Sequence, residues 1–153
     1  MLSPADWLSD ADRVAGLGRR LCGAGVPVDR LALYRRTLHP GILARATAWA
    51  PSRPIEIYDR EHGLDLSLGF IGSSLELAIE SGEAAAFDAA ALDRASGGWS
   101  DPLLGFALKR VLVTPLCRGV ALAIGTRRPT GFADADLALI GKLVQGLAKR
   151  ENR

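Results

Sequence analysis

The sequence has few of the residues on which metal sites, disulfide frameworks and many catalytic centres depend. It holds two cysteines and two histidines in 153 residues. A structural zinc site needs about four Cys or His ligands at short spacing, whereas Cys22, Cys117, His39 and His62 are scattered along the chain. We therefore expect no metal and no cofactor. We expect both cysteines to be reduced and packed among apolar neighbours.

Long apolar runs and an excess of one charge are also missing. No run approaches the roughly 18 apolar residues of a membrane-spanning helix, and Met1–Asp10 lacks the basic start of a secretory signal. Lys and Arg number 19 against 17 Asp and Glu, for a net charge of +2. The basic residues stand in pairs rather than in a concentrated patch, which disfavours nucleic-acid binding. We expect a cytoplasmic protein with no membrane and no nucleic-acid partner.

The composition is otherwise that of an ordinary folded domain, with 48% hydrophobic and 24% charged residues. The length suits one domain with a substantial core. The sequence contains no Gly-x-Gly-x-x-Gly phosphate loop and no Gly-x-Ser-x-Gly nucleophile elbow. We expect residues 1–153 to form a single domain that is not an enzyme, with no catalytic domain in the chain.

Helical periodicity marks both ends of the chain. Apolar residues at helical spacing predict a first helix from Asp6 to about Gly23, ended by glycines and by Pro27. A last helix follows Phe132, with Asp134 as its N-cap.

The last helix also carries a short heptad pattern. The apolar residues at the a and d positions are Leu137, Ile140, Val144 and Leu147. A pattern this short favours a core face packed on the sheet, but Leu139 and Leu143 add a second apolar stripe that a partner helix could cover. We take the four a and d residues as a candidate dimer interface, and a homodimer as the expected assembly.

Between the helices the pattern is that of strands. The expected strands are 28–38, 42–49, a short one from Ile55, 110–116 and 120–126. Short breaks between consecutive strands indicate antiparallel pairing. Residues Phe70–Ile79 and the alanine-rich Ala84–Ala95 read as helical. The fold class is therefore α+β, a largely antiparallel central sheet of five to six strands. The N- and C-terminal helices cover one face and a helical connection covers the other.

Three sequence blocks resemble those of GAF domains. They are Leu21–Arg30, with its glycine, hydrophobic and proline entry to a strand, Arg36–Pro40 (Arg-Thr-Leu-His-Pro), and Thr126–Leu137, with Pro-x-Gly-Phe-x-Asp-x-Asp-Leu. The second block is similar to the N-terminal sensor region of bacterial class III adenylate/guanylate cyclases. The resemblance implies a regulatory domain and not cyclase activity.

Candidate ligand residues follow from this resemblance. Arg36 and His39 lie near where a ligand pocket opens in such folds, and together they could bind an anion. The alternative is that His39 caps a turn while Arg36 is solvated or ion-paired. Trp49, Tyr58 and Trp99 could line the pocket, and they could equally be core or interface residues.

Three functions are compatible with these observations. The first is a non-catalytic cytosolic sensor that binds a small molecule or relays a signal through its terminal helices in a dimer, as in the region preceding cyclase catalytic domains. The second is a dimerisation module without a ligand. The third and weakest is a small enzyme that uses Cys22 or Cys117.

Overall fold

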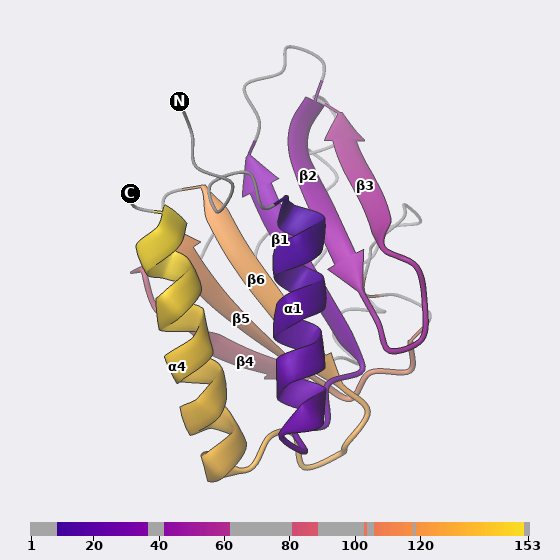
Figure 1. Cartoon of the computed structure of the whole chain (residues 1–153), viewed down its shortest axis with the longest axis vertical. Coiled ribbons are helices and arrows are strands. Elements are labelled where there is room, and N and C mark those ends of the chain that lie inside the picture. The colour runs from indigo at the N-terminus through magenta and orange to yellow at the C-terminus, as the bar shows by residue number, and fades with distance from the viewer. Residues whose placement is uncertain are drawn as a thin grey trace.

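A computed structural model describes residues 9–36, 42–61, 81–88, 103, 106–117 and 119–151. Within them, six strands form one antiparallel sheet in the order β3-β2-β1-β6-β5-β4, and two helices lie side by side on one of its faces (Figure 1). The elements are α1 (Asp10–Gly23), β1 (Arg30–Arg36), β2 (Ile42–Trp49), β3 (Glu56–Glu61), β4 (Ala85–Asp88), β5 (Arg110–Cys117), β6 (Val120–Thr126) and α4 (Asp134–Glu151). The α+β class and the antiparallel sheet predicted from the sequence are confirmed.

Helix α1 begins later than its periodicity predicts. Ser9 is the N-cap, with extended backbone angles, and its hydroxyl oxygen accepts a hydrogen bond from the backbone N–H of Asp12 at 3.2 Å. This cap satisfies one of the unpaired donors of the first turn, so the helix starts at Asp10 and not at Asp6. After the helix, Gly25 has a φ of +86°, which a residue with a side chain adopts only under strain.

Helix α4 is capped by a different residue from the one predicted. The N–H of Leu137 donates to the carbonyl of Ala133 at 3.0 Å, so Ala133 is the N-cap and Asp134 is the first helical residue. The Asp136 carboxylate accepts a hydrogen bond from the Ala133 N–H at 3.1 Å. It thereby takes the part of the acidic residue in a capping box. No helix among the described residues is long and apolar enough to cross a membrane.

Strand β1 lies at the centre of the sheet, between β2 and β6. Strands β5 and β6 form the expected tight hairpin, with Gly119 at a φ of +77° in the turn. The strand register shifts between Pro115 and Cys117, beyond Val113, which is the last residue of β5 that pairs with β4. Proline is therefore tolerated in β5, because it lies at a bulge where the neighbouring strand has already ended.

The prediction of a helix over Ala84–Ala95 is wrong at its start. Ala85–Asp88 form β4, which pairs with β5 from Ala85 opposite Val113 to Asp88 opposite Arg110. Alanine is the best helix former, but helix propensity is a small free energy per residue, and hydrogen bonding to an open sheet edge outweighs it. The predicted helix Phe70–Ile79 and the rest of the helical connection lie outside the described residues.

The two faces of the sheet carry side chains of different size. On the face toward the helices, large aliphatic residues of β1 and β6 pack against α1 and α4. They include Leu31, Leu33, Leu122, Ile124, Val14, Leu17, Leu21, Ile140 and Val144. The opposite face carries a cluster of mostly smaller residues: Ala32, Ala48, Ala121, Ala123, Val111, Val113 and Leu103. We call this second face the alanine face. The separation of the two sets of side chains follows from strand alternation, which points neighbouring side chains to opposite sides of the sheet.

Candidate functional site

A fully buried arginine stands on the alanine face. Arg30 is the first residue of β1, and alternation places it on the same face as Ala32, away from the helices. Its exposed fraction is 0%. Its guanidinium carbon lies 4.0 Å from the ring centroid of Phe106, which is also buried. A cation held against an aromatic ring away from water is stabilised by up to about 2 kcal/mol.

Two residues of β3 make polar contacts with Arg30. Its Nη2 lies 3.2 Å from Oε1 of Glu56 and 3.3 Å from the hydroxyl of Tyr58. The Tyr58 hydroxyl in turn donates to Oε2 of Glu56 at 2.9 Å. Glu56 and Tyr58 are two positions apart on one strand, so both point to the alanine face. The three groups form a closed triangle of charge-assisted hydrogen bonds.

The pKa values of the two acidic groups follow from this triangle. The hydrogen bond from Tyr58 is the largest effect and lowers the pKa of Glu56; burial opposes it, and the smaller contributions of Arg30 and Arg53 lower the pKa further. Burial raises the pKa of Tyr58, and the hydrogen bond to Glu56 raises it further. At neutral pH Glu56 is therefore a carboxylate and Tyr58 a neutral phenol, which is the pairing that the hydrogen bond between them requires.

Arg127 holds Phe106 in place over Arg30. Nε of Arg127 donates to the Phe106 carbonyl at 2.7 Å, and the backbone N–H of Arg127 donates to the Asp29 carboxylate at 2.7 Å. A second guanidinium, that of the exposed Arg53, lies 5.0 Å from the same ring centroid. We call Arg30, Arg53, Glu56, Tyr58 and Phe106 the Arg30 site.

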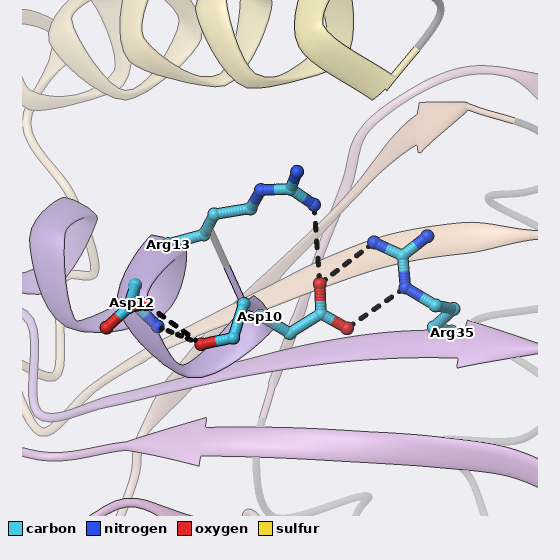
Figure 2. Close-up of polar contacts among 5 residues, drawn as sticks. Asp10, Asp12, Arg13 and Arg35 are labelled. Carbon is cyan, nitrogen blue, oxygen red and sulfur yellow. Dashed lines mark hydrogen bonds and ion pairs between the residues drawn. The ribbon is translucent and has the colours of Figure 1, made fainter. Parts of the chain in front are cut away.

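A second cluster ties the start of α1 to β1. Nε and Nη2 of Arg35 lie 3.0 and 2.9 Å from the two carboxylate oxygens of Asp10, and Nη1 of Arg13 lies 3.5 Å from one of them (Figure 2). The two-point contact of a planar guanidinium with a carboxylate is the strongest form of this ion pair. Arg35 lies an odd number of residues after Arg30 on β1, so the two side chains point to opposite faces of the sheet. Arg30 belongs to the Arg30 site, and Arg35 contacts α1.

We predict a measurable coupling between Asp10 and Arg35. A double-mutant cycle with Asp10→Ala and Arg35→Ala should give about 1 kcal/mol in the free energy of unfolding from urea titrations, because both side chains are only partly exposed and meet at two points. The control Arg19→Ala removes an exposed arginine of the same helix and should change stability by less than about 0.5 kcal/mol. A coupling indistinguishable from zero would show that the contact does not hold α1.

The structure separates the predicted ligand residues. Tyr58 belongs to the Arg30 site. Trp49 is buried on the helix face, where its indole ring contacts Gly18 of α1. A pocket on one face of the sheet therefore cannot be lined by both. Arg36 is the last residue of β1, while His39 and Trp99 lie outside the described residues.

Arg30 was missed by the sequence analysis. Its signal is a charged residue next to an apolar strand, two positions after Val28 and directly before Leu31. A charge within an apolar stretch is buried only when it finds a partner. The sequence offers no means of finding that partner, because Glu56 becomes a neighbour only through the pairing of β1, β2 and β3.

The predicted dimer residues of α4 are used mainly within the domain. Ile140 and Val144 are buried at 2% and 7% exposure against the domain's own sheet, and Leu147 packs on the same core. Leu137 alone among the four is exposed, at 41%. Ile140 and Val144 therefore form part of a core face packed on the sheet, which was one of the two interpretations of the heptad pattern. A dimer through α4 remains a prediction, and it would have to use Leu137 and other residues outside the core stripe.

The described residues between the helices and the sheet leave a small cavity. An apolar cavity of about 10 Å³ lies there, lined by Arg13, Val14, Leu17, Leu33, Leu116, Leu122 and Leu147. A volume of this size holds about one water molecule, and every lining residue except Arg13 is aliphatic. This cavity therefore offers no room for a small-molecule ligand.

The cysteines lie at opposite ends of the sheet. Cys22 is exposed, so the expectation that it packs among apolar neighbours is wrong, and its thiol donates to the carbonyl of Val28 at 3.6 Å, near the start of β1. Cys117 pairs with Val120 near the end of β1 and packs on the core. Partial burial raises the pKa of the Cys22 thiol, which lowers its reactivity. The described residues contain no group of three or more His, Cys, Asp or Glu placed to bind a metal.

Comparison with known proteins supports the fold. No protein-family model matches the chain, and no curated protein matches it. Among solved structures, the GAF domain of a two-component sensor histidine kinase from Bacillus halodurans superposes with a TM-score of 0.61 at 18% identity, covering 95% of each chain. The chain has the fold of a GAF domain. A red/green cyanobacteriochrome in its red light-absorbing state is similar at a TM-score of 0.51 and 14% identity, covering 92% of each chain.

Proposed function

We propose that this GAF-like domain is a non-catalytic cytosolic sensor that binds a small molecule on its alanine face and relays binding through its terminal helices. The observation that carries the proposal is the Arg30 site. A fully buried guanidinium stands beside the small, buried side chains of the alanine face, and its partner Glu56 is partly exposed to solvent. Small-molecule sites combine apolar walls with a few convergent polar groups.

Among the described residues, no charged side chain on the opposite face of the sheet is fully buried. Its large aliphatic residues are packed against α1 and α4, and the cavity that remains is the size of one water molecule. The likeness to the histidine kinase sensor domain is consistent with a sensory role. The sequence block Arg36–Pro40, which resembles cyclase sensor regions, suggests the same kind of regulatory setting for this domain.

The relay we propose runs through β1. This strand holds Arg30 on the ligand side and Arg35 on the helix side, where Arg35 contacts Asp10 at the start of α1. A ligand that changes the position of β1 therefore acts on α1 through a two-point ion pair. A ligand shifts such an equilibrium only to the extent that it binds one arrangement more tightly than the other.

There are two alternatives to this proposal. A dimerisation module without a ligand would need an exposed apolar surface, and Leu137 on α4 is the residue that favours it. A cysteine enzyme is the weakest alternative, because the two cysteines lie at opposite ends of the sheet and the pKa of Cys22 is raised.

Native mass spectrometry of freshly purified, untagged protein tests the proposal. We expect a dimer that retains a small molecule, and we expect the variant Arg30→Met to lose the adduct while Arg19→Ala keeps it. An adduct-free dimer would favour the dimerisation module. A bare monomer would contradict the relay through paired helices.

A further inference from the structure

The Glu56 carboxylate occupies the Arg30 site in the way that a bound ligand would. One of its oxygens faces Arg30 at 3.2 Å and the other accepts the Tyr58 hydrogen bond at 2.9 Å. The two donors therefore converge on the two oxygens of one planar group. We propose that the Arg30 site is a carboxylate-binding site, normally filled by Glu56, and that the ligand of the proposed sensor carries a carboxylate that replaces it.

The donors and the occupant differ in how firmly they are held. Arg30 is completely buried under Phe106, and Phe106 is fixed by the hydrogen bond from Arg127. Glu56 begins the edge strand β3, and its side chain is 38% exposed. A partly exposed carboxylate can turn into water, whereas a fully buried guanidinium cannot, and it is destabilised when it loses a carboxylate partner. The donors of Arg30 and Tyr58 therefore remain able to bind another carboxylate when Glu56 leaves.

The local charge also favours an incoming anion. Arg30 and Arg53 place two guanidiniums over the Phe106 ring, at 4.0 and 5.0 Å from its centroid. Glu56 is an acidic side chain in contact with Arg30, while the Asp29 carboxylate accepts a hydrogen bond from the backbone of Arg127. A ligand carboxylate in the place of Glu56 meets Arg30 and is attracted by the charge of Arg53, which already lowers the pKa of Glu56. A phosphate has more charged oxygens than these two convergent donors satisfy.

The inference rests on the proposed function but has its own test, which uses acetate as the smallest carboxylate probe. The variant Glu56→Ala vacates the site. Its thermal unfolding midpoint should rise with added sodium acetate relative to sodium chloride at the same ionic strength, by roughly 3–6 °C when acetate reaches about tenfold its Kd. The control Glu83→Ala removes an exposed carboxylate outside the site and should respond equally to the two salts.

A second variant and a second measurement test whether the stabilisation by acetate arises at the Arg30 site. Adding Tyr58→Phe to Glu56→Ala removes one donor while keeping the ring, and it should weaken acetate binding about tenfold. In the wild-type protein, whose folding is not in question, acetate should produce saturable amide NMR shifts at Arg30, Glu56 and Tyr58 that chloride does not.

Equal responses of Glu56→Ala to acetate and chloride, or an acetate effect that Tyr58→Phe leaves unchanged, would overturn the inference. The absence of acetate-specific shifts at these three residues in the wild type would do the same. If native mass spectrometry still detects a retained small molecule, the sensor proposal stands and only the carboxylate assignment fails.

Discussion

Replacing Ile140 by Asp is expected to lower the free energy of unfolding by about 4 kcal/mol or more, enough to unfold much of the protein. Ile140 is 2% exposed and packs in the core between α4 and the sheet. The substitution removes a large aliphatic side chain and leaves a charge with no partner among aliphatic neighbours. Circular dichroism during urea titration measures the loss.

Leu137→Asp is the matched control on the same helix. Leu137 is 41% exposed, so the same chemical change should alter the free energy of unfolding by less than about 1 kcal/mol. If Leu137 belongs to a dimer interface, this variant stays folded but elutes as a monomer in size-exclusion chromatography. A folded, stable Ile140→Asp protein would contradict the assignment of Ile140 to the core.

Replacing Gly18 by Ala is expected to destabilise the domain by about 2 kcal/mol, although alanine is the better helix former. Gly18 lies in α1 where the helix meets β2, and a Cβ there would overlap the indole ring of Trp49, 2.6 Å from its Cδ2. Both residues are buried, so the ring must move or the helix must rise from the sheet. The unfolding midpoint in urea and the Trp fluorescence should both change.

Gly16 provides the control within the same helix. A Cβ at Gly16 meets nothing within 4 Å, so Gly16→Ala should stabilise the protein by roughly 0.5–1 kcal/mol through helix propensity alone. Equal effects of the two substitutions would show that α1 does not pack on Trp49 as described.

The elements with strong local signals were predicted from the sequence. The strands at Ile42–Trp49 and Val120–Thr126 begin and end as predicted. Strand β4 was not predicted, because Ala85–Asp88 has no local preference for extended structure and becomes a strand only by pairing with β5. The alternation that separates Trp49 from Tyr58 depends in the same way on the register of β2 with β3.

The candidate site was less predictable for a related reason. Tyr58 was selected as an aromatic residue, but Arg30, Glu56 and Phe106 come from three separate segments that carry no shared motif. Their contact distances are set by the order of strands and by the loop that Arg127 anchors. Such a site becomes visible only once the sheet has been assembled.

Methyl NMR of protein labelled at alanine and leucine methyl groups tests the sensor proposal most directly. The protein is stripped by unfolding and refolding, then titrated with the small-molecule extract of its expression host. We predict shifts of the Ala32, Ala48 and Ala123 methyl groups on the alanine face, with smaller shifts at Leu33 and Leu122 under the helices. No shifts at all, or shifts confined to those leucines, would contradict a ligand site on the alanine face.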